Sequence, residues 1–314
     1  MLHDAELEGL RAAMDAIPRW RTGGFVSSCG GGAITATGLG GQAGVGEVCL
    51  IERRMPARGL HTPLFEERDA LLAEVVGFTA AGVQLIPYEE PRGIGHGARV
   101  ALGPGLGLLR PSLGWRGRVL DALGRPIDDG PPLPQGPLAY PIQARGIAAE
   151  RRRGLGPRLT LGVRALDLFT PCCEGQRMGI FAGSGVGKST LLSMITAGTD
   201  AEVLVIGLIG ERGRELHDVL EHTLGAAGRA HTVVVVATSD MPAMLRRRAA
   251  YVTLTIAEFL RDQGLKVLCL MDSVTRFAMA LREICLAAGE GPTSRGYPPG
   301  VFAELPRLLE RAGP

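Results

Sequence analysis

The chain has 314 residues, of which 46% are hydrophobic and 21% charged, with a formal net charge of +2. This composition excludes a disordered or fibrous chain and leaves room for two globular domains. Such a small basic excess gives no support for a nucleic-acid partner, and no apolar run reaches the length that a membrane span needs.

The first twenty residues predict an amphipathic helix rather than a targeting signal. Acidic residues interrupt the apolar ones, so a signal peptide is not expected and the chain is expected in the cytoplasm. Four apolar residues at intervals of three and four form one stripe on this helix: Leu7, Leu10, Met14 and Ile17. Two interpretations are open, because the stripe packs either on its own domain or on another protein.

Residues 21–102 predict a small β-barrel, because short β-prone runs alternate with glycine-rich turns. The runs are Gly44–Ile51, Ala73–Phe78, Val83–Pro87 and Ala98–Leu102. Residues 103–150 are rich in Gly and Pro and predict a connector rather than core, with one strand at Gly117–Leu120.

Residues 151–314 predict an α/β domain, a parallel sheet with helices on both faces. The predicted strands are Met178–Phe181, Val203–Ile209, Thr232–Ala237 and Val267–Met271. The longest predicted helices are Ala243–Arg261 and Arg276–Leu286. Near-continuous apolar strands that alternate with helices are typical of a sheet buried on both sides.

A phosphate-binding loop is predicted directly after the run Met178–Phe181. The sequence AGSGVGKS at 182–189 offers glycines that let the loop curl around phosphate, a lysine for the terminal phosphates and a hydroxyl for Mg²⁺. Ala182 stands where the usual pattern has its first glycine. The predicted nucleotide-binding residues are Gly183, Ser184, Gly185, Val186, Gly187, Lys188, Ser189 and Thr190.

Charged residues follow two other predicted strands. Asp272 ends the run Val267–Met271, in the position of the acid that holds Mg²⁺ in P-loop ATPases. Glu211 and Arg212 follow Val203–Ile209, at the edge where open parallel sheets bind ligands. Taken alone, an acid at a strand end is commonly a helix cap, and a charged run is commonly solvated. Beside a phosphate loop, Glu211 is a candidate base for water and Arg212 a candidate clamp on phosphate.

Longer segments of the sequence resemble the flagellar export ATPases, a family related to the catalytic subunits of rotary ATP synthases and to the ATPases of injectisomes. The segments are FAGSGVGKST, LIGERGRE, VVVVATSD, CLMDSVTRFAMALREI and RGYPPGVFAELPRLLERAG, with VGEVCLIE, AEVVGF and GRVLDALGRPID upstream. The resemblance covers nearly the whole chain. It implies a P-loop domain of the RecA-like kind and ATP hydrolysis coupled to export of flagellar proteins through a type III secretion apparatus.

The resemblance also implies roles for residues that match the motifs. Lys188 and Ser189 would bind phosphate and Mg²⁺, the implied cofactor. Asp272 would lie near Mg²⁺, and Glu211 would position or deprotonate the attacking water. These roles make Lys188, Glu211 and Arg212 the expected catalytic residues.

Two arginines and a tyrosine complete the implied site. Arg212 and Arg276 would face the γ-phosphate. Tyr297 lies near the site in the family, although a packing role in its loop serves equally well.

Assembly and partners are implied in the same way. The resemblance points to a homo-oligomer, a hexameric ring at full length, with a stator-like regulatory protein at the N-terminal helix. It also implies an export gate, chaperones and export substrates, and at most a peripheral membrane association at the flagellar base. Family members continue past RLLERAG into further strands and a C-terminal helical domain. The chain is therefore expected to be a truncated product or a fragment with weak activity.

Other functions stay open at this point: an injectisome ATPase, a noncatalytic nucleotide-binding subunit, a hexameric RNA translocase, or a scaffold with a vestigial site. Glu211 argues against a noncatalytic subunit, since such subunits lack a carboxylate there. An RNA translocase should show aromatic and basic residues interleaved on its barrel. The barrel region holds only four aromatic residues: Phe25, Phe65, Phe78 and Tyr88.

Two remaining features are interpreted as structural. The six cysteines form no CxxC pair and have no histidine at ligand spacing, so they are read as reduced and mostly buried. The arginine runs at 151–153 and 246–248 are read as solvated surface, because consecutive residues of a helix point in different directions.

Overall fold

The computed structural model describes residues 23–39, 41–53, 70–103, 105–183 and 186–313. The predicted helix at residues 1–20 and the loop residues Ser184 and Gly185 lie outside the described residues. The chain divides into two compact units, Met1–Gly105 and Leu106–Pro314, and each is described by itself. Within the described ranges, no helix combines the length and the apolar character that crossing a membrane requires.

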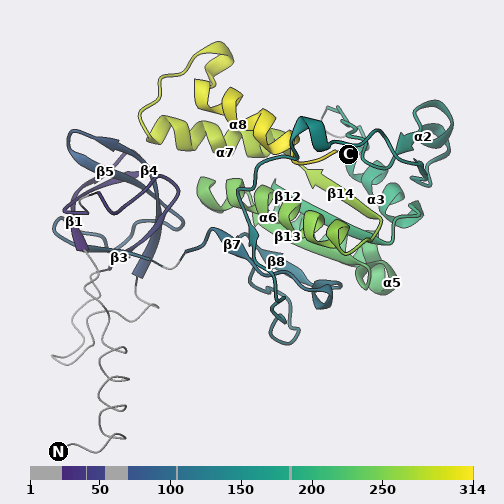
Figure 1. Ribbon diagram of the computed structural model, residues 1–314, viewed down its shortest axis with the longest axis horizontal. Coiled ribbons are helices and arrows are strands. Elements are labelled where there is room, and N and C mark those ends of the chain that lie inside the picture. Colours follow the sequence, from purple (N-terminus) through teal and green to yellow (C-terminus); the bar gives the residue numbers. More distant parts are fainter. Residues whose placement is uncertain (1–22, 40, 54–69, 104, 184–185, 314) are drawn as a thin grey trace, which may run out of the picture. The chain divides into compact units, whose positions relative to one another are not determined.

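The first unit is a closed antiparallel barrel with the strand order β1-β2-β5-β4-β3-β6 (Figure 1). Its strands are β1 Gly23–Gly30, β2 Ala33–Thr37, β3 Val48–Glu52, β4 Ala70–Thr79, β5 Gly82–Pro87 and β6 Arg99–Leu102. Alternate apolar side chains fill the interior, as the two-residue period of a strand requires. The small barrel expected from the sequence is confirmed.

The second unit contains a four-stranded parallel sheet with the order β14-β12-β13-β8. Its strands are β8 Val119–Asp121, β12 Val203–Glu211, β13 Thr232–Thr238 and β14 Val267–Asp272. Two short antiparallel pairs accompany it, β7 Leu108–Leu109 with β9 Tyr140–Pro141 and β10 Arg158–Leu159 with β11 Cys172–Cys173.

Helices follow the strands of this unit (Figure 1). They are α2 Arg164–Phe169, α3 Lys188–Gly198, α4 Gly213–Asp218, α5 Gly225–Arg229, α6 Ala243–Asp262, α7 Val274–Ala287 and α8 Pro299–Leu309. A π-helical turn, η4 Val219–Leu224, joins α4 to α5, and short 3₁₀ turns lie at η2 Leu113–Trp115, η3 Ala149–Arg151 and η5 Ser294–Gly296.

Both faces of the parallel sheet are covered, as predicted. Val205 and Val235 pack into the core that contains α6 and α7. Ile206 and Val234, one residue away, point to the opposite face and pack with α4 and η4. On the α6 side, a Cβ on Gly207 would lie 2.6 Å from Oγ1 of Thr253, so glycine permits the close approach of α6 to β12.

The region predicted as a connector contributes to the core instead. Residues 119–121 form β8, which hydrogen-bonds to β13 and extends the sheet. Trp115, Leu120 and Ile142 are among the largest fully buried side chains of the chain. Gly and Pro content predicts where a chain turns but not whether the segments between turns are buried, and this explains the error.

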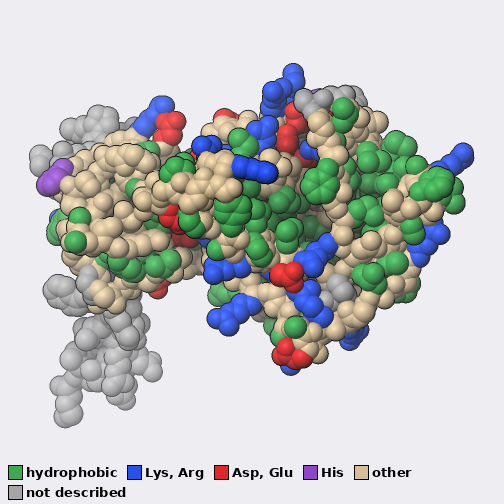
Figure 2. Space-filling view, turned by 90° about the horizontal axis from the view of Figure 1, so that it is seen from above, with side chains coloured by type: hydrophobic (Ala, Val, Ile, Leu, Met, Phe, Trp, Pro, Cys, Tyr) green, Lys and Arg blue, Asp and Glu red, His purple; other side chains and the backbone are tan. Residues whose placement is uncertain are grey.

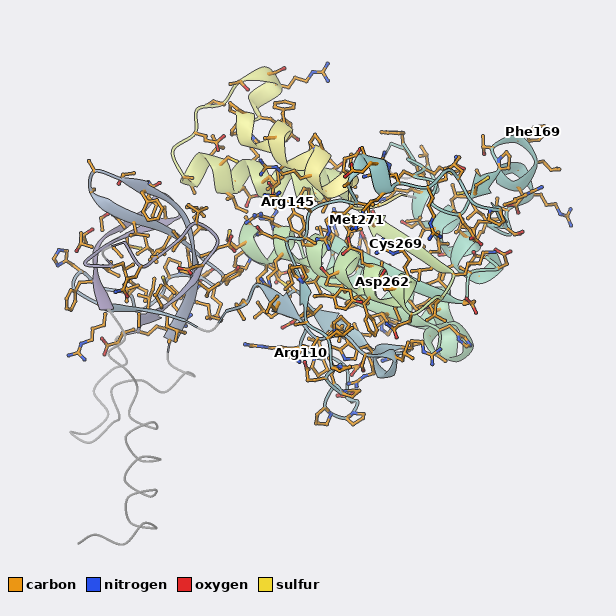
Figure 3. The ribbon with its side chains drawn as sticks, viewed as in Figure 1. Arg110, Arg145, Phe169, Asp262, Cys269 and Met271 are labelled. Atoms are coloured by element: carbon orange, nitrogen blue, oxygen red, sulfur yellow. The ribbon has the colours of Figure 1, made fainter. Side chains whose placement is uncertain are left out.

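The segment Met178–Phe181 is not a strand, contrary to the prediction. It pairs with none of the described strands, and the Phe181 side chain is 98% exposed. β14 pairs only with β12 within the described part of the sheet, and its side chains are mostly half-buried. Figure 3 shows Cys269 and Met271 on β14, and Phe169 at the far end of α2. A strand needs a hydrogen-bonding neighbour, which an apolar run alone cannot supply.

The arginine run 246–248 is not solvated surface, so that interpretation was wrong. Arg246 pairs with Glu283, Arg247 pairs with Glu304, and the two guanidinium-bearing side chains are only 11% and 14% exposed. Arg248 donates to the backbone carbonyls of Ala122 and Leu106. These bonds attach residues 106–122 to α6.

A partly buried ion pair between Arg118 and Asp128 holds the turn after β8. The Asp128 carboxylate accepts hydrogen bonds from Arg118 and from the backbone N–H groups of Val119 and Gly130. Burial alone would raise the pKa of Asp128, but these hydrogen bonds and the charge of Arg118 lower it from 3.8 to about 2. A carboxyl with a depressed folded pKa stabilises the fold above its unfolded pKa.

We predict that Asp128→Asn lowers the free energy of unfolding by about 2 kcal/mol at pH 7, because the shift of the pKa corresponds to an energy of that order. The difference from wild type should shrink as the pH falls from 3.8 toward 2, where wild-type Asp128 becomes protonated. Denaturant unfolding followed by Trp115 fluorescence in a Trp20→Phe background measures this. Asp129→Asn, an exposed neighbour, is the matched control, and equal stability of the two variants would contradict the prediction.

Candidate functional site

Three strands of the parallel sheet end at one edge and bring polar residues together there. β12 ends at Glu211 and β14 at Asp272, and Asp272 pairs in register with Leu208 of β12. β13 ends at the same edge, beside β12, and the N–H of Ser239 just after it donates to the carbonyl of Glu211 at 3.0 Å. The carboxyl edge of an open parallel sheet is the usual place for a ligand.

The phosphate-binding loop leads into α3, a helix of 11 residues that begins at Lys188. Gly187 immediately before it has a φ of +98°, a left-handed conformation that favours glycine. Ser189 and Thr190 are exposed in the first turn, and their hydroxyls make no hydrogen bond within the described residues. The unpaired N–H groups of a helix start attract anions.

Lys188 forms an ion pair with Asp272. The pair is partly enclosed, with side-chain exposures of 29% for Lys188 and 12% for Asp272. The next residue, Ser273, caps α7 by accepting a hydrogen bond from the backbone N–H of Arg276. The loop lysine, the end of β14 and the start of α7 therefore meet at one point.

The Glu211 carboxyl lies close to this ion pair and to another acid. Its pKa is raised from 4.5 to about 7, chiefly by burial and further by a hydrogen bond with Glu215 and the negative charge of Asp272, while the charge of Lys188 acts in the opposite direction. Glu211 is therefore an acid that exchanges a proton near neutral pH, as a general base for water requires.

Two arginines, Arg276 and Arg212, accompany these acids. Arg276 packs closely on the backbone of Gly210: a Cβ added to Gly210 would lie only 2.9 Å from the Cβ of Arg276. Gly210 also has a φ of +69°, a left-handed conformation that favours glycine. Arg212 is exposed at the start of α4. Neither guanidinium makes a hydrogen bond or ion pair with any residue that the structure describes, so both are free to bind an anion.

The arrangement suits a nucleoside triphosphate with Mg²⁺. Asp272 and Ser189 offer carboxylate and hydroxyl oxygens, the hard ligands that Mg²⁺ takes in partnership with phosphate and water. Lys188 and the two arginines offer positive charge for phosphate. The residues present fit the metal predicted from the sequence.

The structure adds one residue to those predicted. Glu215 lies in the first turn of α4 and hydrogen-bonds to Glu211. In the sequence, only its spacing of four residues from Glu211, across the end of a predicted strand, hinted that the two side chains lie close together. Tyr297 packs edge-on against Phe302 and under Arg282, and no contact with Lys188 or Glu211 is among its interactions in the described structure.

Comparisons with known proteins point to one family. A family model described as the nucleotide-binding domain of the ATP synthase alpha/beta family matches residues 162–314. The flagellum-specific ATP synthase of Caulobacter vibrioides is 57% identical over 244 residues, which cover 78% of this chain and 55% of the relative. The type 3 secretion system ATPase of Xanthomonas euvesicatoria is 50% identical over 283 residues, which cover 87% of this chain and 59% of the relative.

A solved structure extends the likeness to the fold. The assembled ATPase EscN of the type III secretion system of enteropathogenic E. coli, in complex with its central stalk EscO, superposes with a TM-score of 0.81 at 40% identity. The match covers 93% of this chain and 67% of EscN. The chain spans between 55% and 66% of the length of the curated relatives it matches.

We predict that Glu211→Gln stabilises the nucleotide-free chain at pH 8 by about 3 kcal/mol, the energy that corresponds to the shift of the pKa, and has no effect near pH 4.5. The folded pKa of about 7 exceeds the unfolded value of 4.5, so wild type loses stability as the pH rises through this window, whereas glutamine does not titrate. Denaturant unfolding at several pH values measures the difference. The exposed Glu150→Gln serves as the control, and a Glu211→Gln difference that does not change with pH would refute the assignment.

Proposed function

Because the chain belongs to the ATP synthase alpha/beta family, we propose that it binds Mg-ATP and hydrolyses it to ADP and phosphate. We propose further that hydrolysis supports the export of flagellar proteins through a type III secretion apparatus. The observation that carries the proposal is the meeting of Lys188, Asp272 and Glu211 at the carboxyl edge of the sheet, beside the phosphate-binding loop.

Binding would use the positive groups of the site. The backbone N–H groups from Gly183 to Ser189 would enclose the phosphates, and Lys188 would exchange its partner Asp272 for the terminal phosphates. Arg276 and Arg212, which have no other partner in the part of the chain that the structure describes, would contact the γ-phosphate. Mg²⁺ bound with ATP, held by Ser189 and Asp272, would neutralise phosphate charge.

Hydrolysis would begin when Glu211 takes a proton from a water molecule. The water oxygen forms a new bond to the γ-phosphorus, and the bond from that phosphorus to the oxygen of the β-phosphate breaks. Positive charge from Lys188 and Arg276 stabilises the oxygens that gain negative charge. A base with a raised pKa accepts the proton more readily than an ordinary glutamate does.

The flagellar role is favoured over the injectisome role by the names of the relatives. Flagellum-specific ATP synthases from Caulobacter, Bacillus and Salmonella are among them, whereas the Xanthomonas relative and EscN belong to type III secretion systems. An RNA translocase is less well supported, because Tyr88 is buried with its hydroxyl on Glu74, which leaves only Phe25 and Phe78 as exposed aromatic residues on the described part of the barrel, and the net charge of the chain is only +2.

Assembly and partners are also proposals for this chain. EscN is described as an assembled ATPase and as a complex with a central stalk, which supports a homo-oligomeric ring and a stalk-like partner here. We propose in addition a stator-like regulatory protein at the N-terminal helix, contacts with the export gate, chaperones and export substrates, and a location in the cytoplasm at the flagellar base.

We expect saturable Mg-ATP binding by this chain and its loss in Lys188→Ala, because the charge on the terminal phosphates disappears. Isothermal calorimetry measures the binding. Lys266, the other lysine of the chain, pairs with Asp200 on the surface, so Lys266→Ala is the matched control. Amine-reactive labelling adds a direct readout: ATP should protect Lys188 but not Lys266. Folded protein that does not bind ATP at millimolar concentration would exclude the proposed function.

In a protein extended to the length of the relatives, we expect Glu211→Gln to keep ATP affinity and lose turnover by about 10² to 10⁴-fold. The amide has nearly the shape of the carboxylate but is a far weaker base. Phosphate release under saturating ATP measures turnover, with Glu150→Gln as the control. Parental turnover in the Gln variant would show that Glu211 has a structural role.

A further inference from the structure

The segment that leads into the phosphate-binding loop has few attachments of its own. Residues 178–183 make no hydrogen bond with any residue that the structure describes, and the Phe181 side chain is almost fully exposed. Ile180 packs, half-buried, against a small core that includes Ile195 of α3. The course of this segment therefore depends largely on what holds its two ends.

Each end of the segment is held by a basic side chain. Lys188 holds one end through its ion pair with Asp272. Arg177, which follows the turn after β11, holds the other. Its Nη1 donates to the backbone carbonyl of Leu309 at 2.8 Å and to the carboxylate of Glu310 at 2.9 Å. Both acceptors lie at the end of α8, where carbonyl groups lack partners within the helix and a cation is favoured.

The end of α8 is a firm point of attachment. Arg311, directly after Glu310, is buried, and its side chain pairs with Glu258 of α6 at 2.7 Å and donates to Oγ1 of Thr255 at 3.0 Å. Leu308 lies in the core that α6 and α7 share. An exposed ion pair is usually weak, because two long side chains must be ordered to form it. Here the backbone that supplies one of the acceptors is already fixed by buried neighbours.

Arg152 contacts the same carboxylate from another segment. Its Nη2 donates to the backbone carbonyl of Glu310 at 2.6 Å and pairs with the Glu310 carboxylate at 2.7 Å. The hydrogen bond and charge of Arg177, and to a smaller extent the charge of Arg152, hold the pKa of Glu310 below its ordinary value. Figure 2 shows basic and acidic side chains interspersed on the face that carries α7 and α8. Arg152 follows η3, outside the segment that leads to Lys188, so it offers a matched comparison for Arg177.

We propose that Arg177 is a positioning residue of the nucleotide site, because it holds the start of the segment 177–188 on the end of α8. The inference rests on the proposed binding of Mg-ATP. Asp272 precedes α7 and Glu310 follows α8, so one pair of packed helices holds both ends of the segment. ATP would draw Lys188 away from Asp272 and leave Arg177 in place. The phosphate-binding loop would then stay attached to α8 while Lys188 turns to phosphate.

Calorimetric titration of the full chain with Mg-ATP tests the proposal by comparing Arg177→Gln with Arg152→Gln. Each variant removes one guanidinium from Glu310, so both should lose a similar amount of stability. Only Arg177→Gln should raise the Kd for Mg-ATP, by about threefold, a factor within the range of exposed ion pairs. Arg177→Lys, which keeps the positive charge, should restore most of the affinity. An unchanged Kd in Arg177→Gln would overturn the proposal, as would an equal loss of affinity in Arg152→Gln.

A double variant tests whether Arg177 acts through Glu310. Adding Glu310→Gln to Arg177→Gln should weaken Mg-ATP binding no further, because the contact between the two side chains has already gone. Losses of affinity that simply add would contradict the proposed path through Glu310.

Amine-reactive labelling of the nucleotide-free chain, followed by peptide mapping, gives a readout that needs no ATP. The chain has two lysines, Lys188 and Lys266. Lys188 should react about threefold faster in Arg177→Gln than in wild type or Arg152→Gln, because a released segment weakens its pair with Asp272. Lys266 is the internal reference. Wild type that binds no Mg-ATP would contradict the proposed function, whereas unchanged Lys188 reactivity in folded Arg177→Gln would overturn the role of Arg177.

Discussion

The positive charge of one ammonium group, that of Lys188, offsets the negative charge of the carboxylates at the carboxyl edge of the parallel sheet. It forms an ion pair with Asp272, and it partly opposes the burial, the Glu215 hydrogen bond and the Asp272 charge that together raise the pKa of Glu211. Carboxylates gathered at one edge would repel one another without it. Lys188, at the end of the predicted phosphate-binding loop, is thus joined to the end of β14 by an ion pair, and its charge also acts on Glu211 at the end of β12.

The sheet makes the contact possible, and this part could be predicted from the sequence. A strand buried on both faces must be almost entirely apolar, so the runs that became β12, β13 and β14 stood out, and the polar residues at their ends had to lie at one edge. Glu211 and Asp272 were therefore expected near the phosphate loop. The proximity of Glu215 to Glu211 was not expected, because it depends on the residue at which α4 begins.

Other features were not predictable because they depend on partners distant in the sequence. The run Met178–Phe181 has the composition of a strand, yet a strand exists only where a neighbour accepts its hydrogen bonds. Arg246 and Arg248 look like solvent-exposed charge in sequence, but Glu283 and the carbonyls of residues 106 and 122 take up their donors. Local composition predicted a strand at 117–120, but it could not reveal that this strand joins the parallel sheet or that residues 103–150 supply part of the core.

The charges of the site indicate which class of ligand suits it. Lys188 is already paired with Asp272, while Arg212 and Arg276 have no anionic partner among the described residues. The guanidinium groups of these two arginines bind most strongly to a ligand that carries several negatively charged oxygens. A triphosphate would supply these oxygens, and it would also compete with Asp272 for Lys188. If Lys188 turned toward phosphate in this way, Asp272 would lose its partner and its oxygens would become available to a cation, so we expect phosphate and cation to bind most strongly together.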